Sequence, residues 1–220
     1  MATDWYRNDA WTPHISAEFE RRLARARAHN RPEYLRVQGV HLQRAGHIEA
    51  AREMWVRVLD QPFDKADVGG YSRAGALEHL ADSYAQSDPP TAERWYRRLL
   101  SEYPDLQCTS QQVELSLAEV LVAQANPAAA RQALQAWRDR GGSHTPEDLL
   151  RAHIVLVDIA VADGDRRTAR QAARGALQAA DLPAPFFNHP RVGVAHLDPE
   201  THARLRRLAR RLWLPAMFRR

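Results

Sequence analysis

The chain has only one cysteine, Cys108, and one lysine, Lys65, among its 220 residues. A single cysteine excludes an intrachain disulfide, and we therefore expect a reducing compartment. No apolar run approaches the about 20 residues that cross a bilayer, and the N-terminus has no basic start followed by an apolar stretch. We therefore predict a cytoplasmic protein that is neither secreted nor integral to a membrane.

Sequence motifs for catalysis and metal binding are missing as well. Neither a G-x-G-x-x-G motif nor a P-loop occurs, and no histidine is linked in sequence to Cys108. The histidine pairs at 41 and 47 and at 196 and 202 lack the i, i+4 spacing of a helical zinc site. We predict a non-enzymatic protein with no catalytic residues, no cofactor and no metal site. An enzyme hypothesis would need a ligand pocket around Phe186, Phe187 and His189.

Basic charge is concentrated at one end of the chain. The excess of arginine over lysine, together with abundant alanine, is typical of a GC-rich bacterial genome. The net charge is +4, yet residues 199–220 alone hold seven arginines and one glutamate, a net +6. The remaining residues therefore sum to −2, and the high isoelectric point describes a basic tail.

An alanine returns at nearly constant spacing inside similar helix pairs. Ala51, Ala92, Ala130 and Ala169 are separated by 41, 38 and 39 residues. A period near 40 made of two helices predicts an all-α, right-handed α-solenoid of about four hairpins. The apolar spacing predicts helices over 33–45, 47–59, 73–86, 90–102, 111–124, 127–138, 146–163 and 166–180.

Both ends of the predicted array carry additional elements. A helix over 14–29 follows the aromatic residues Trp5, Tyr6 and Trp11, which we expect to fold back onto the first helix pair. An irregular apolar segment over 181–199 is expected to be held across the last pair, before a final helix over 200–212. The predicted division is thus 1–32 for the N-terminal cap, 33–180 for four helix pairs, and 181–220 for the C-terminal cap.

The helix pairs resemble tetratricopeptide repeats. The resemblance is most specific in the first pair, at Gly39, Leu42, Gly46, Ala51 and Trp55, and the second pair ends similarly at Tyr103-Pro104. The whole chain is similar to bacterial tetratricopeptide-type proteins of unassigned activity, in three segments: Trp5-Tyr6-Arg7-Asn8 with Trp11, Tyr34 to Gln38, and His189 to Gly193. The resemblance implies a helical scaffold that binds a partner, and it implies no catalytic residue.

In such arrays the first helix of each pair lines a concave groove. Aligning the pairs assigns to this groove Arg36, Gln43, Arg44, Glu78, Asp82, Gln86, Glu119, Arg151 and Asp158. Three carboxylates, those of Asp82, Glu119 and Asp158, take the same position in successive pairs, which predicts an acidic row spaced by roughly 10 Å. The groove hypothesis is a scaffold that binds a protein or a basic peptide. The competing interpretation is that these residues form only the solvated faces of helices.

The basic C-terminal helix supports a second hypothesis. It presents Arg204, Arg206, Arg207, Arg210 and Arg211, which could contact the phosphates of a nucleic acid. An acidic lipid surface and docking of a protein remain open as other partners of this helix. The simplest interpretation is a capping helix whose arginines keep the array in solution. The sequence does not predict the oligomeric state.

Overall fold

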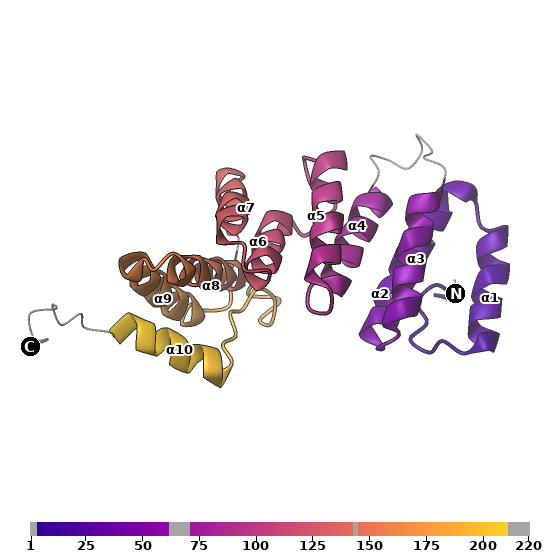
Figure 1. Cartoon of the computed structure of the whole chain (residues 1–220). Coiled ribbons are helices and arrows are strands. Elements are labelled where there is room, and N and C mark those ends of the chain that lie inside the picture. Colours follow the sequence, from indigo (N-terminus) through magenta and orange to yellow (C-terminus); the bar gives the residue numbers. More distant parts are fainter. Residues whose placement is uncertain (1–3, 62–70, 143–144, 211–220) are drawn as a thin grey trace, which may run out of the picture. The chain divides into compact units, whose positions relative to one another are not determined.

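The structure is a computed structural model that describes residues 4–61, 71–142 and 145–210. These residues form ten α-helices and one short 3₁₀ helix and contain no strand, which confirms the all-α prediction. Residues 62–70, between the first and second predicted helix pairs, and Arg211 with the residues that follow it lie outside the described residues. Figure 1 shows the helices α1 (Pro13–Arg25), α2 (Arg31–Arg44), α3 (Ile48–Asp60), α4 (Tyr71–Tyr84), α5 (Pro89–Glu102), α6 (Val113–Ala123), α7 (Pro127–Asp139), α8 (Pro146–Ala162), α9 (Arg166–Ala180) and α10 (Pro199–Arg210).

Five of these helices begin where a short polar residue precedes a proline. The polar side chain accepts a hydrogen bond from a backbone N–H of the first turn, and the proline has no N–H to leave unsatisfied. The five starts are Thr12-Pro13, Asp88-Pro89, Asn126-Pro127, Thr145-Pro146 and Asp198-Pro199. At the start of α8, Asp148 returns a hydrogen bond to the backbone of Thr145, which completes a capping box.

The first helix is shorter than the predicted 14–29, because α1 ends at Arg25. Arg31 donates from Nη2 to the carbonyl oxygen of Ala24 at 2.8 Å and from Nε to that of Ala26 at 3.1 Å. These bonds satisfy carbonyl groups that a longer helix would have used itself. The chain then turns through a 3₁₀ helix, Ala28–Asn30, into α2.

The chain divides into two compact units, Met1–Val113 and Glu114–Arg220. This boundary falls at the first residue of α6, inside the helix predicted over 111–124 as the start of the third pair. In the first unit α2 packs against α3, α4 against α5, and α4 also contacts both α2 and α3. Its core includes fully buried Leu35, Leu42 and Trp55.

The N-terminal aromatic residues pack onto the first unit, as predicted. The ring centroid of Trp5 lies 5.4 Å from that of Phe19 and 5.0 Å from that of Tyr34. Tyr6 stacks on Tyr34 at 4.6 Å, and Trp11 also contacts Phe19. Edge and tilted ring contacts of this kind stabilise beyond the area that they bury.

The second unit is built around the pair α8 and α9. These two helices pack along each other, α7 packs against α8, and α10 packs against α9. The buried side chains of α9 are all alanines, at positions 169, 172, 173, 176 and 179. Such small side chains let neighbouring helices approach closely, and the fully buried Leu205 of α10 belongs to the same core cluster.

Among the described residues, one part of the segment between α9 and α10 packs against the second unit and another part is exposed. The backbone N–H of Glu147 donates to the carbonyl oxygen of Gly193, and Ala195 is buried in the core of the second unit. This part matches the prediction that the segment lies across the last pair. The side chain of Phe187, in contrast, is 98% exposed. Over the described ranges, no helix combines the length and the apolar character needed to span a lipid bilayer.

Candidate functional site: an arginine-lined cleft between α8 and α10

The second unit contains a cleft of about 550 Å³ between the end of α8 and one face of α10. Its lining residues are Val161 of α8 and Arg204, Arg207, Leu208 and Arg210 of α10. The volume lies within the ordinary range for small-ligand sites or for a few residues of a peptide. The lining combines apolar side chains with guanidinium groups.

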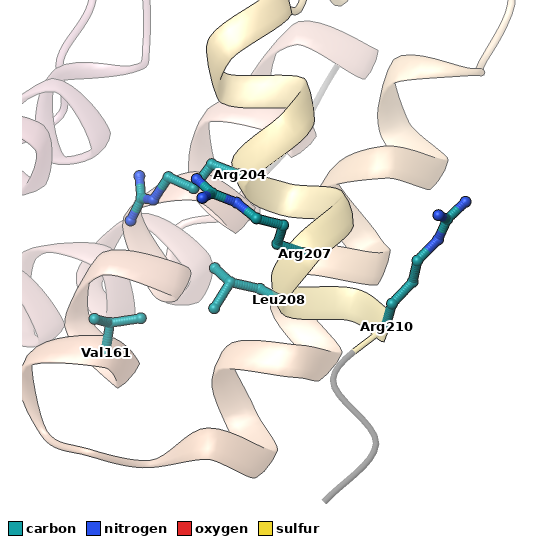
Figure 2. A pocket seen from close by; sticks show the side chains of 5 residues that line it. All are labelled: Val161, Arg204, Arg207, Leu208 and Arg210. Carbon is teal, nitrogen blue, oxygen red and sulfur yellow. The ribbon is translucent and has the colours of Figure 1, made fainter.

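Figure 2 shows how these side chains lie. Arg204, Arg207 and Leu208 extend from α10 toward the side on which Val161 lies, whereas the guanidinium group of Arg210 points away from Val161. The valine is 49% exposed. The cleft therefore has an apolar wall beneath two neighbouring guanidinium groups.

One carboxylate already neutralises part of this charge. Arg204 forms an ion pair with Asp158 of α8, and both side chains are partly buried. Arg206, Arg207 and Arg210 are exposed, and none of them has a carboxylate partner among the described residues. Asp158 of α8 thus holds one arginine of α10 in place, and the other three arginines of α10 are exposed to solvent.

Acidic residues are nearly absent from α9 and α10. Together α9 and α10 carry eight arginines and a single acid, Glu200. The sequence within the second unit holds 16 arginines and 11 acidic residues, a net +5, whereas the first unit sums to −1. Residues 199–220 alone sum to +6, so the positive charge of the second unit comes from α10 and the sequence that follows it.

The predicted groove residues of the first unit form contacts within the unit. Arg36 pairs with Glu33 through two hydrogen bonds of 2.7 and 2.8 Å. Glu78 is buried and accepts from the backbone N–H of Ser110 at 3.0 Å and from its hydroxyl at 2.5 Å. Burial raises the pKa of the Glu78 carboxyl, and the bonds from Ser110 act in the opposite direction.

The other groove candidates of the first unit have different surroundings. Asp82 accepts a hydrogen bond of 2.5 Å from the hydroxyl of Tyr96. Gln43 is half-buried, and Arg44 is exposed in the last turn of α2. Gln86 does not lie on a helix, as the predicted range 73–86 required, because α4 ends at Tyr84 and Gln86 lies in the following turn.

In the second unit the predicted groove residues pair with one another or with α10. Arg151 of α8 donates two hydrogen bonds, of 2.8 and 2.7 Å, to Glu119 of α6, and a third to the hydroxyl of Ser116. Asp158 pairs with Arg204, as described above. The predicted row of Asp82, Glu119 and Asp158 stays a prediction, because Asp82 belongs to the other unit. Each of the three carboxylates nevertheless has a partner within its own unit.

Sequence reasoning missed the apolar part of the cleft and the arginines of α9. Val161 and Leu208 are ordinary apolar residues in sequence, and only the packing of α10 brings them to one cleft. The arginines at 167, 170 and 174 do carry a signal, since their spacing of three and four places them on one helical face.

Comparison of the chain with protein-family models, with curated proteins and with solved structures finds no match. Within the described ranges, no group of three or more histidine, cysteine, aspartate or glutamate side chains could hold a metal ion. Function is therefore argued from the geometry and charge of the cleft alone.

Proposed function

We propose that the protein is a non-enzymatic interaction module that binds a segment of a partner protein in the α8–α10 cleft. In this proposal the described helices belong to a right-handed array of about four tetratricopeptide-like hairpins. The contacts within each unit, of α2 with α3, α4 with α5, and α8 with α9, support hairpin units of this kind.

The observation that carries the proposal is the mixed lining of the cleft. Arg207 offers a planar, permanently charged donor, while Val161 and Leu208 offer apolar contact beside it. The described lining consists of arginine, valine and leucine side chains, which supply hydrogen-bond donors and apolar surface for binding. The matching ligand is a peptide segment that combines carboxylates with an apolar side chain.

This ligand has the opposite charge from the basic peptide that the sequence suggested. The reason is that the carboxylates of Glu119 and Asp158 already form ion pairs with Arg151 and Arg204. A basic ligand would have to break these ion pairs and leave a partly buried guanidinium group without its partner. An acidic ligand would instead contact arginines of α10 that have no carboxylate partner among the described residues, so no ion pair would have to break.

Fluorescence anisotropy with two synthetic peptides tests the proposal. A peptide of alternating glutamate and leucine should bind, and the corresponding lysine and leucine peptide should not. Arg207→Glu should weaken the acidic peptide at least about tenfold, and Val161→Ser should weaken it less. Arg25→Glu, an exposed charge reversal on α1 in the other unit, is the matched control and should leave affinity nearly unchanged. Tighter binding of the basic peptide, lost on charge reversal at Asp82 and Glu119, would instead establish the groove hypothesis.

A nucleic acid is the second candidate partner, favoured by the eight arginines and single acid of α9 and α10. Each phosphate contact releases counterions, so affinity would fall steeply with salt. Substituting Arg206, Arg207 and Arg210 together by alanine should reduce the logarithmic salt slope of oligonucleotide binding by nearly three. The control removes the exposed residues Arg25, Arg27 and Arg44 of the first unit. A slope that falls equally in both variants would exclude α10 as the contact surface.

A further inference from the structure

A second basic hollow lies on the other arginine-bearing helix of the second unit. It measures about 500 Å³, and its lining includes Arg167, Arg170 and Arg174 of α9 together with His153 of α8. At 1.5 Å per residue, the first and last of these arginines are spaced by about 10 Å along the helix. None of these residues lines the α8–α10 cleft.

The imidazole ring of His153 fits in this hollow because the residue opposite it, Gly175 of α9, has no side chain. A Cβ atom placed on Gly175 would come within 2.4 Å of Cε1 of the imidazole, so the ring rests directly on the backbone of α9. Neither ring nitrogen has a hydrogen-bond partner among the described residues, and Nδ1 is shielded from solvent. Burial lowers the pKa of His153, and the positive charge of Arg138 lowers it further. The ring is therefore neutral at physiological pH and still carries one N–H to donate.

Among the residues that the structure describes, no carboxylate lines the hollow. The nearest acid in sequence is Asp165, whose oxygens accept hydrogen bonds from the backbone of Arg167 and Thr168 and from the Thr168 hydroxyl. Arg174 makes only a long contact of 3.5 Å with the carbonyl oxygen of Ala209. Arg167 and Arg174 thus have no carboxylate partner among the described residues, so their charge is available to an external anion.

We propose that this hollow binds the phosphate group of a phosphorylated ligand, through the guanidinium groups of Arg167, Arg170 and Arg174 and an N–H of His153. A phosphate monoester has three terminal oxygens and close to two negative charges, which match several arginines better than one carboxylate does. The ligand is either a free phosphate monoester or the terminal phosphate of a nucleic acid. The hollow is separate from the α8–α10 cleft, so this proposal does not depend on the peptide proposed for that cleft.

Calorimetry of the full chain with inorganic phosphate and with a simple sugar phosphate tests the site, with the unphosphorylated sugar as the blank. Alanine at both Arg167 and Arg174, which are exposed, should weaken binding at least about tenfold. The matched control removes Arg25 and Arg27, two exposed arginines of the first unit, and should change affinity less than about twofold. Equal losses in the two variants, or no binding of either phosphate compound, would overturn the proposal.

A second measurement reports on the histidine itself. Phosphate should raise the pKa of His153, followed by NMR of its ring nitrogens, because a nearby dianion stabilises the imidazolium form. An unchanged titration with saturating phosphate would place the anion elsewhere. Oligonucleotides with and without a 5′-phosphate distinguish the two sources of the ligand. If both bind equally and inorganic phosphate does not bind, the arginines act only as part of a polyelectrolyte surface and the proposed site is wrong.

Discussion

Gln38 and Asn8 join through three hydrogen bonds, although 30 residues separate them. The amide nitrogen of Gln38 donates to the carbonyl oxygen of Asn8 at 2.8 Å, and its Oε1 accepts from the backbone and side-chain N–H groups of Asn8. Gln38 has no exposed surface, so these bonds satisfy a fully buried amide. The pair thereby fastens the aromatic N-terminal segment to α2.

Replacing Gln38 by alanine should lower the free energy of unfolding by about 2 kcal/mol, because three hydrogen bonds with the partly buried Asn8 would be lost. Urea unfolding followed by tryptophan fluorescence measures the change. Gln43→Ala is the control, since Gln43 lies on the same helix, is half-buried and has no side-chain bond with the described residues. It should cost less than about 0.5 kcal/mol. Equal costs would mean that the hydrogen bonds of Gln38 contribute little.

Gly39 leaves room for the indole of Trp55. A Cβ atom at position 39 would lie 2.3 Å from Nε1 of Trp55, which donates to the carbonyl oxygen of Arg36. Gly39→Ala should therefore destabilise the first unit by about 2 kcal/mol, even though alanine favours a helix. Gly75→Ala is the matched test in α4, where the new atom would meet only the flexible side chain of Arg36 at 3.0 Å. We expect it to be neutral or slightly stabilising in thermal unfolding.

His79 predicts a dependence of stability on pH. Burial lowers its pKa to about 4, and Arg36, whose Nη1 lies 3.4 Å from Nε2, adds to the effect. A histidine with a depressed pKa contributes its full stability above the unfolded value of about 6.5, and this contribution is lost as the pH falls toward 4.

The loss should reach up to about 3 kcal/mol, measured by urea unfolding across this range. His79→Gln should flatten that part of the profile. An identical profile in the variant would assign the acid sensitivity to other groups. Glu78 is not one of them, because its raised pKa makes the folded state more stable, not less, as the pH falls.

Asp158 should restrain ligand binding in the α8–α10 cleft. Asp158→Asn removes the carboxylate that pairs with Arg204, so two arginines instead of one become available beside Val161. Affinity for the glutamate and leucine peptide should rise about threefold in anisotropy measurements. Glu119→Gln removes one charge from the same unit at the Arg151 pair and should have a smaller effect. A loss of affinity in Asp158→Asn would show that the carboxylate positions Arg204 for the ligand.

Local structure was largely predictable from the sequence. The helix over 166–180 has the predicted bounds, because Asp165 caps its start and the alanine spacing marks its buried face. The end of α1 was missed because it depends on Arg31, a residue beyond the helix whose side chain folds back onto it. Periodicity describes which face of a helix is buried, but not which distant side chain completes its end.

The candidate site was predictable only in part. The arginines of α10 stand out by composition, whereas Val161 and the ion pair of Asp158 with Arg204 depend on how α10 packs. That pair links residues 46 positions apart, and the pair of Glu119 with Arg151 spans 32. The sequence pattern predicted that these residues line a charged groove, because a sequence does not show which carboxylates and guanidinium groups form ion pairs.

The alanine-filled interior of α9 has a consequence for how its outer surface behaves. Alanine holds a helical backbone better than any other residue, so α9 keeps its shape without large side chains to fasten it. The helical backbone fixes the intervals between the arginines at 167, 170 and 174. These intervals should hold as long as α9 stays packed against α8 and α10, since packing supplies most of the stability of a helix of this length.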